Sequence, residues 1–391
     1  MSNSKRLPLA KVQIKHFKAI RETGTLRLAP LSVFIGNNGS GKSSVLEAME
    51  TVQRLVLEDL DAALVTFGGY EHARYKGEAK PRPRARGERL LSGSAVHFAF
   101  QGHARRAPYT ATLSIQEREN NEVFFSEERV TRGSETWKRD EQGRYTYQAA
   151  HARRLEALQL PPHESILQRS LADFVGQWQF VRMNPDAMGS PTPMQRTGRE
   201  IRLAPDGSNI AQYLLSLRDE SSEAFEGLID AMRVVLPYAT DLQPQITREL
   251  ERSVYLRLVE QKFEVLGRML STGTLRVLAL LALFRHPRAP PLVFIEELEN
   301  GLDPRTLALV VSEIRSAVLS GRQQVIATTH SPYLLDLLDL SHLILVERVE
   351  GTPVFYRPAD DAELSKWASE FAYTPGTLYT RGELERRGRR R

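Results

Sequence analysis

Apolar and polar residues alternate differently in successive parts of the chain, and each pattern predicts a different kind of structure. Residues 11–17 and 31–36 are strand-like, and between residues 43 and 60 apolar side chains recur every three or four positions, as in a helix with one buried face. Residues 95–148 hold β-rich runs separated by polar turns, which predicts an antiparallel meander. From Ser271 onward helical and strand-like stretches alternate, which predicts α/β structure with a parallel sheet.

Two segments between these parts differ in character. Residues 68–93 are rich in Gly, Pro and Arg and predict an exposed loop, whereas residues 152–238 have mostly helical periodicity, followed by one more strand at 253–260. No heptad array is sustained, which argues against a long coiled-coil arm. The predicted division is an N-terminal part of an α/β core at 1–67, a basic loop at 68–94, an antiparallel β-lobe at 95–150, a helical insertion at 151–242, a C-terminal part of the core at 243–358, and a C-terminal helix with an arginine-rich tail at 359–391.

Composition narrows the class of protein. The 391 residues suffice for one large core with insertions, and the lack of cysteine excludes disulfides, iron–sulfur clusters and thiol catalysis. No apolar run approaches the roughly 20 residues that a membrane span needs, and residues 1–17 lack the apolar stretch of a signal peptide. We therefore expect a soluble, cytoplasmic protein without a membrane partner.

The net charge of +5 comes from two short segments. Residues 74–89 hold seven basic side chains and two glutamates, and residues 381–391 hold six arginines and two glutamates, so the rest of the chain is negative. Clustered arginines favour contact with the phosphates of DNA or RNA, and Tyr75 could stack on a base. The alternative interpretation is that both segments are solvated tails without a function.

The strongest chemical signal is the run GNNGSGKS at residues 36–43, which fits the phosphate-loop pattern G-x-x-x-x-G-K-[ST] in full. The run follows a predicted strand and precedes a predicted helix, so its backbone N–H groups and the positive end of the helix dipole would surround a polyphosphate. Lys42 is predicted to reach the β- and γ-phosphates of ATP, and Ser43 is predicted to ligate Mg²⁺.

A second predicted site element is the buried strand at 292–297, which ends in Glu296 and Glu297. Ligands of parallel sheets bind at the carboxyl ends of the strands. Strand alternation would put the two carboxylates on opposite sides, so that one holds Mg²⁺ while the other polarises the attacking water. Which of the two is the base stays open at this stage, and a solvated acidic strand end is the alternative.

Three further features have both a functional and a purely structural explanation. His330 follows a buried strand, one βα unit after the glutamates, and is predicted to sense the γ-phosphate; the alternative is a structural histidine. Ser271 is a plausible helix N-cap, and Gly273 would let a ligand approach that helix end, although a plain capped helix explains both. Asp303 is explained by helix capping alone, which does not exclude a dimer contact.

The chain resembles the ABC-type ATPase heads of the RecF, SMC and OLD group, and most closely the stand-alone ATPases labelled AAA-family, in the runs GNNGSGKSS, LSTGTLR, LVFIEELENGLDP and ATTHSP. The resemblance spans most of residues 11–348. It implies an α/β P-loop NTPase fold with an ABC-type head, and ATP bound between two head-to-tail subunits. It makes 36–44 the Walker A motif, 270–276 the signature, 295–297 Walker B, Asp303 the D-loop and His330 the switch histidine. The implied nucleotide-binding residues are Asn37, Asn38, Gly39, Ser40, Gly41, Lys42, Ser43, Ser44, Ser271, Gly273 and Asp303; Glu297 and His330 are the catalytic candidates, and Ser43 and Glu296 the Mg²⁺ ligands.

The sequence departs from this pattern at three points. Glu296 stands where an aspartate is usual in Walker B, and the Q-loop glutamine has no clear counterpart, Gln101 being only a candidate. About 60 residues follow His330, so we expect no TOPRIM nuclease domain of the OLD type.

The function implied by the resemblance is a dimeric ATP-hydrolysing switch that acts on nucleic acid. We expect it to work in bacterial antiphage defence with a separate effector, such as a nuclease. The alternative is a RecF-like DNA-repair clamp that binds DNA without an effector, and a third possibility is the ATP-binding subunit of a transporter.

Overall fold

The structure, a computed structural model, describes residues 6–77, 94–118, 120–139, 143–149, 156–194, 200–247 and 252–384. The chain forms two compact units, which we call the first unit (residues 1–178 and 340–391) and the second unit (residues 179–339). Within the described ranges, every helix is too short or too polar to span a lipid bilayer.

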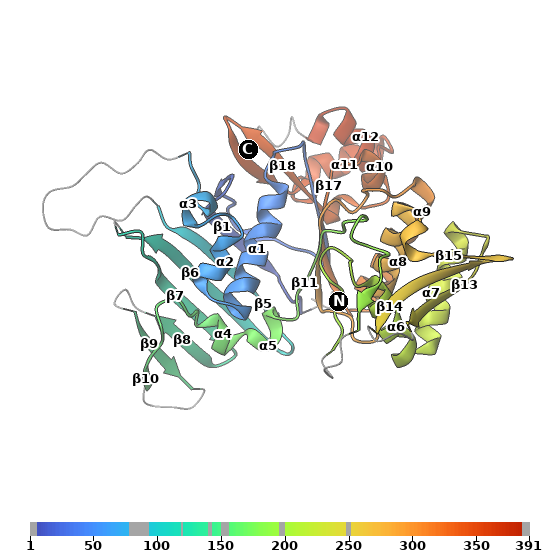
Figure 1. Ribbon diagram of the computed structural model, residues 1–391. Coiled ribbons are helices and arrows are strands. Elements are labelled where there is room, and N and C mark those ends of the chain that lie inside the picture. Colours follow the sequence, from blue (N-terminus) through green and yellow to red (C-terminus); the bar gives the residue numbers. More distant parts are fainter. Residues whose placement is uncertain are drawn as a thin grey trace, which may run out of the picture. The chain divides into compact units, whose positions relative to one another are not determined.

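In the described part of the first unit, nine strands form one antiparallel sheet (Figure 1). β1 lies between β2 and β5 and also pairs with β3, and β5 to β10 follow one another as a meander. The meander predicted for 95–148 is therefore present, with β8 as a strand that the pattern did not predict. The strands are β1 (Lys11–Phe17), β2 (Ile20–Glu22), β3 (Leu26–Arg27), β5 (Val96–Ala104), β6 (Ala107–Glu117), β7 (Val123–Arg132), β8 (Glu135–Arg139), β9 (Arg144–Gln148) and β10 (Glu156–Gln159).

One face of this sheet is buried because its strands alternate apolar and polar residues. Every second residue of β5 is buried, and its Phe98 and Phe100 lie almost entirely out of solvent. The Phe98 ring packs edge-on against Phe17, and the Phe100 ring against Trp178. Helices α1 and α2 contact this part of the unit, as Figure 1 shows.

The first unit also contains a parallel strand pair that leads into the phosphate loop. β4 (Leu31–Ile35) pairs in parallel with β18 (Leu343–Val349), and β18 pairs antiparallel with β19 (Thr352–Tyr356). The remaining helices of this unit are α1 (Lys42–Leu57), α2 (Leu60–Val65), α3 (Tyr70–Ala73), α4 (Leu167–Ser170), α5 (Ala172–Val175), α11 (Ala362–Glu370) and α12 (Pro375–Thr380), with 3₁₀ turns at Leu340–His342 and Pro358–Asp360.

Two helix predictions in this unit need correction. The helix predicted for 43–60 ends at Leu57, because the side chain of Asp59 accepts the Ala62 N–H and caps a separate helix, α2. The segment predicted as a loop from residue 68 begins with helix α3, since the buried Tyr70 anchors it through a 3.1 Å hydrogen bond to the Ile115 carbonyl. Residues 78–93 of that predicted loop lie outside the described residues.

The second unit combines a parallel and an antiparallel sheet. β11 (Gln179–Val181), β16 (Leu292–Ile295) and β17 (Gln324–Thr329) are parallel neighbours in that order. The antiparallel sheet consists of β12 (Thr192–Pro193), β14 (Ser253–Glu260), β13 (Ala239–Ile246) and β15 (Phe263–Leu266). The helices are α6 (Ile210–Glu220), α7 (Ser222–Val235), α8 (Thr272–Arg285), α9 (Pro304–Leu319) and α10 (Pro332–Asp336), with a 3₁₀ turn η1 at Gly267–Met269.

The stretch predicted as mostly helical, 152–238, contains strands as well. α6 and α7 follow the prediction, but β11 is a buried strand of three residues that pairs with β16. The Phe180 ring of β11 stacks on Phe294 of β16, with 4.4 Å between the ring centroids. A segment of three residues forms a strand because it pairs with a neighbouring strand, and three residues are too few for a periodic pattern to predict it.

Candidate functional site

The phosphate loop lies in the first unit, between the end of β4 at Ile35 and the start of α1 at Lys42. Gly41 has a φ of 110°, a left-handed conformation that favours glycine. A Cβ on Gly36 would lie 2.0 Å from the Val346 carbonyl oxygen of β18. Both glycines of the motif are therefore required by the backbone path.

The loop presents hydrogen-bond donors and positive charge. Lys42 Nζ donates to the carbonyls of Gly36 (2.6 Å) and Asn37 (3.0 Å), so the lysine folds over the loop. Helix α1 begins without a side-chain cap and without an acidic residue in its first turn, which leaves its N-terminal N–H groups and dipole available to an anion. The buried Ser40 Oγ has no partner among the described residues, a further group for a ligand to satisfy.

The remaining residues predicted for this loop divide by exposure. Asn37, Asn38 and Gly39 are exposed at its tip, Ser44 is buried in the first turn of α1, and Ser43 is exposed. The Ser43 hydroxyl is a hard oxygen donor of the kind that Mg²⁺ prefers. The donor set of this loop fits a magnesium–polyphosphate group.

The acidic turn lies in the second unit, directly after β16. β16 ends at Ile295 and Glu297 has a φ of 48°, so the strand alternation that we used to place the two glutamates on opposite sides does not extend to them. Instead, different partners distinguish them. Glu296 Oε2 forms an ion pair with Arg182 Nε at 2.5 Å.

Glu297 is held by its backbone, and its side chain is only weakly engaged. Its N–H donates to Thr328 Oγ1 (2.9 Å), and its carbonyl accepts from Arg276 Nη2 (3.1 Å). The carboxylate accepts one long bond, 3.4 Å, from Asn300 Nδ2. Glu297 thus has a fixed backbone and a carboxylate that keeps acceptor capacity, which suits a group that orients water.

His330 follows the end of β17 and contacts a glutamate that sequence reasoning did not select. The Glu299 carboxylate accepts the His330 backbone N–H at 2.8 Å, and its Oε1 lies 3.2 Å from His330 Nδ1. The His330 side chain remains about half exposed. The acidic turn and the histidine of the second unit are therefore joined directly.

The signature residues begin helix α8. Ser271 is its N-cap and accepts the Thr274 N–H at 3.1 Å. A Cβ on Gly273 would lie 2.6 Å from the Gly301 carbonyl oxygen, so this glycine is needed for packing within the chain. Arg276, on the same helix, is 4% exposed and bonds the carbonyls of Met183 and Glu297, which ties α8 to the acidic turn.

Asp303 caps helix α9. Its carboxylate accepts the N–H groups of Arg305 (2.9 Å) and Thr306 (3.2 Å) and the Thr306 hydroxyl, and these hydrogen bonds lower its pKa. The side chain is exposed, so the cap leaves it accessible. Gln101, the Q-loop candidate, lies within β5 and pairs with Lys11 and Thr110.

The structure therefore presents the candidates as two groups. Residues 37–44 belong to the first unit, while the two glutamates, His330, the signature residues and Asp303 belong to the second. Sequence reasoning missed Arg182, Glu299 and Thr328. The sequence offered a hint for Glu299, because it is a third carboxylate just after the glutamate pair. It offered none for Thr328, which is an ordinary residue of a buried strand.

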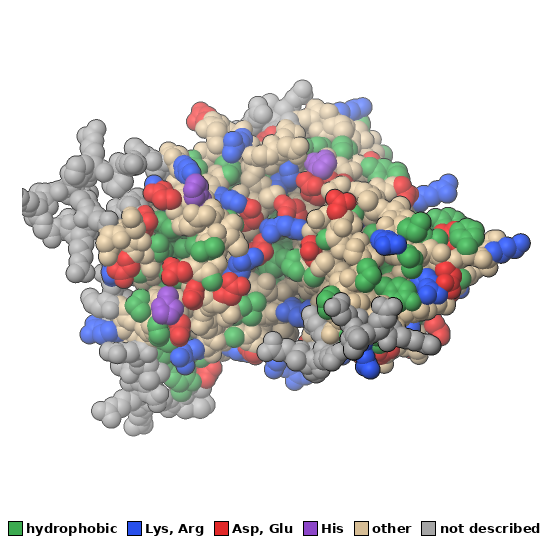
Figure 2. Space-filling model, viewed as in Figure 1, with side chains coloured by type: hydrophobic (Ala, Val, Ile, Leu, Met, Phe, Trp, Pro, Cys, Tyr) green, Lys and Arg blue, Asp and Glu red, His purple; other side chains and the backbone are tan. Residues whose placement is uncertain are grey.

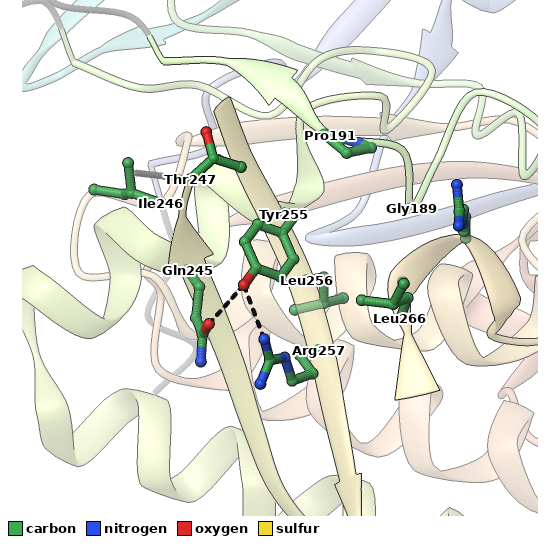
Figure 3. A pocket seen from close by; sticks show the side chains of 11 residues that line it. Gly189, Pro191, Gln245, Ile246, Thr247, Tyr255, Leu256, Arg257 and Leu266 are labelled. Carbon is green, nitrogen blue, oxygen red and sulfur yellow. Dashed lines mark hydrogen bonds between the residues drawn. The ribbon is translucent and has the colours of Figure 1, made fainter. Parts of the chain in front are cut away.

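A hollow of about 680 Å³ lies elsewhere in the second unit, against the sheet of β13 and β14 (Figure 3). The Tyr255 hydroxyl there donates to Gln245 Oε1 (2.7 Å) and accepts from Arg257 Nη2 (2.9 Å). Phe263 of β15 and Met269 of η1 are exposed apolar side chains, close in sequence to residues that line this hollow. Figure 2 shows hydrophobic side chains at the surface around β15. None of the residues predicted from the sequence lines this hollow.

Comparisons with known proteins agree with the motifs. Residues 31–336 match the family described as "AAA domain, putative AbiEii toxin, Type IV TA system". No curated protein sequence matches the chain. The chain is similar to a crystal structure of an SMC head bound to the C-winged helix domain of ScpA, with 15% identity and a TM-score of 0.50 over 89% of this chain and 96% of that one.

Two further SMC heads show lower scores. The head domain from Thermotoga maritima has 14% identity and a TM-score of 0.39, over 89% of this chain and 98% of that one. The Pyrococcus furiosus head with an extended coiled coil, bound to the C-terminal domain of ScpA, has 12% identity and a TM-score of 0.46. The match covers 89% of this chain and 95% of that one. The predicted fold class, an α/β P-loop NTPase with an ABC-type head, is confirmed by the first of these likenesses. Because the family match spans most of the sequence, the chain belongs to this AAA-domain family of P-loop ATPases.

Proposed function

We propose that the chain hydrolyses ATP with the help of Mg²⁺ and acts as a nucleotide-driven switch. The observation that carries this proposal is the phosphate loop, in which Lys42 lies over the loop and helix α1 starts without a cap. Such a loop has the donors for a polyphosphate and no acidic side chain in the helix's first turn to repel it. Mg²⁺, when bound with ATP, neutralises charge on the transferred phosphoryl group.

The two glutamates take different roles in this proposal. Glu296 is paired with Arg182, and it shares its oxygens between that arginine and the metal. Glu297 has a rigid backbone and an accessible carboxylate, and we assign it the orientation of the attacking water. His330 senses the γ-phosphate, and Ser43 and Glu296 hold Mg²⁺.

The proposed active form is a head-to-tail dimer with composite ATP sites. Ser271 and Asp303 are exposed at the N-terminal ends of α8 and α9, where a second subunit could approach them. Gly273 keeps the start of α8 free of side-chain bulk. These three residues would contact ATP held by the phosphate loop of the partner.

The biological setting that we propose is bacterial antiphage defence, with DNA or RNA as the trigger and a separate effector such as a nuclease. The family description, which names a toxin of a Type IV toxin–antitoxin system, supports a role of this class. A pull-down with the product of the neighbouring gene tests it. A nuclease-like partner supports the proposal; binding to DNA without any effector would favour a repair clamp, and a permease partner a transporter subunit.

The enzymatic part is tested by ATP binding and turnover in two variants. Lys42→Ala should weaken ATP binding, since the lysine contacts the ground state, whereas Glu297→Gln should bind ATP normally and fail to hydrolyse it. Glu313→Gln is the matched control, because Glu313 pairs with Arg285 in the same unit and lies outside the motifs in the sequence. Equal turnover in Glu297→Gln and wild type would disprove the assignment, and loss of activity at Glu296→Gln alone would exchange the two roles.

A further inference from the structure

Glu299 occupies a turn whose backbone bonds fix its position. The Asn300 N–H donates to the Glu297 carbonyl at 3.0 Å, and the Leu302 N–H donates to the Glu299 carbonyl at 3.1 Å. The neighbouring Leu298 is buried, and its N–H donates to the Thr328 carbonyl of β17 at 3.1 Å. The Glu299 side chain is consequently held 10% exposed beside the end of β17.

The contacts of the carboxylate define the orientation of His330. Both the backbone N–H and Nδ1 of His330 lie within hydrogen-bond distance of Glu299, at 2.8 and 3.2 Å. An ionised carboxylate only accepts hydrogen bonds, so Nδ1 must carry the proton in this contact. Nε2 is then the ring nitrogen left to meet a phosphate or a water, on a side chain that is 48% exposed.

The second carboxylate oxygen of Glu299 adds to the case for a role beyond packing. Glu299 Oε2 is buried and has no hydrogen-bond partner among the described residues. A buried acceptor without a partner costs stability, so packing alone gives no reason for a carboxylate here. Its retention is explained by a task that a neutral apolar side chain cannot perform.

We propose that Glu299 is the positioning residue of His330: it holds the main chain at residue 330 and the ring with Nε2 turned outward. The inference rests on the proposed ATPase function and assigns Glu299 no direct contact with the reacting atoms. It predicts that Glu299 and His330 act as one unit, so that the loss of either side chain removes the same contribution to turnover.

A double-mutant cycle tests this inference through kcat and KM for ATP. Glu299→Ala and His330→Ala should each lower kcat by about 10- to 100-fold with KM changed less than about twofold, because misplacing a catalytic group costs rate of this order. The double variant should be no slower than His330→Ala alone. Glu299→Gln, whose amide oxygen can accept the same two bonds, should recover part of the loss, and Glu313→Gln again serves as the control.

The outcomes separate the inference from the function on which it rests. If His330→Ala turns over ATP at the wild-type rate, the role assigned to His330 under the proposed function is wrong. If His330→Ala is slow but the two losses multiply in the double variant, Glu299 acts independently of His330 and the positioning inference is overturned. Should Glu299→Ala fail to fold, Glu299→Asp takes its place in the cycle, because its shorter side chain withdraws the carboxylate from the ring.

Discussion

The Tyr379 hydroxyl donates a 3.3 Å hydrogen bond to Oδ1 of Asn37, which joins helix α12 to the phosphate loop. Helix α12 is itself anchored in the first unit, since Leu378 is fully buried and the Thr374 side chain caps the helix. The hairpin of β18 and β19 also backs the loop, with Pro353 2.9 Å from the position of a Cβ on Gly41. The segment after residue 340 thus helps to shape a loop near residue 40.

We predict that Tyr379→Phe weakens ATP binding by about 2- to 10-fold, the range expected for losing one hydrogen bond. The ring and its packing remain, so kcat should stay within about twofold of wild type while KM rises. Isothermal titration with ATP and steady-state kinetics measure the two effects. Tyr356→Phe is the matched control, since that hydroxyl bonds Asp361 at 3.1 Å. Unchanged affinity in Tyr379→Phe would show that the contact has no influence on the loop.

Mixing two inactive variants tests the composite sites of the proposed dimer. The contacts at the start of α8 show which substitution in the signature is suitable. Gly273→Asp would clash with the Gly301 carbonyl of its own chain, so its inactivity would prove nothing about a partner. Ser271→Asp is cleaner, because aspartate is an equally good N-cap while its charge would repel a phosphate.

We expect Lys42→Ala and Ser271→Asp each to be inactive alone, and their mixture to regain activity through one intact site per heterodimer. Turnover should also depend cooperatively on protein concentration in the wild type. Ser271→Asp with normal turnover, together with a monomer in light scattering under ATP-trapping conditions using Glu297→Gln, would contradict the dimer.

The buried ion pair between Glu128 and Arg139 leads to a prediction about how stability depends on pH. Their side chains are 0% and 1% exposed, with 2.8 Å between Glu128 Oε2 and Arg139 Nε. Burial raises the pKa of Glu128 to about 7, although Arg139 and the Ser165 hydroxyl act in the opposite direction. Between the ordinary value of 4.5 and about 7 the folded chain therefore holds more protons than the unfolded chain, and this group's contribution to stability falls as the pH rises.

Arg139→Leu should cost about 3–5 kcal/mol of unfolding free energy at pH 8, because it leaves an ionised carboxylate buried without its partner. At pH 5.5 the carboxyl is protonated in the folded chain, so the cost should be clearly smaller. Urea unfolding followed at both pH values measures this difference. Glu128→Gln removes this titrating group, so its stability relative to wild type should increase from pH 5.5 to pH 8. An equal cost of Arg139→Leu at the two pH values would argue against the raised pKa.

Sequence patterns predicted those elements that carry their own periodicity. β1 and β14 begin and end at the predicted residues, 11–17 and 253–260, because each is a continuous β-rich run. β8 and β11 were missed, since a short strand depends on pairing with a neighbour. For the candidate site, motif spacing selects Lys42, Glu297 and His330, but it gives no access to contacts such as Arg182 with Glu296, which join segments 114 residues apart.

The contact of the two basic segments with nucleic acid remains a prediction, and the structure describes part of the first segment. Arg74 forms a forked pair with Glu71, with bonds of 2.8 and 3.1 Å, and its side chain is 15% exposed, so its charge is already engaged. Arg82, Arg84 and Arg86 lie outside the described residues, as do residues 385–391. Any phosphate contact by the first segment should therefore depend on these three arginines more than on Arg74.

Reversing the charge at Arg82, Arg84 and Arg86 together should weaken binding to unrelated duplex sequences by similar factors, because phosphate contacts carry no sequence information. Each lost phosphate contact removes about 0.9 from the slope of log K against log salt, so three contacts would flatten it by about 2.7. Basal ATPase should be unchanged. Charge reversal at Arg105 and Arg106, two exposed arginines between β5 and β6, is the control and should leave the slope as it is. Two results would contradict nucleic-acid contact: no salt-sensitive binding of wild type to DNA or RNA with ATP present, or unchanged binding after charge reversal. In either case an acidic protein is the better candidate for the binding partner of this segment.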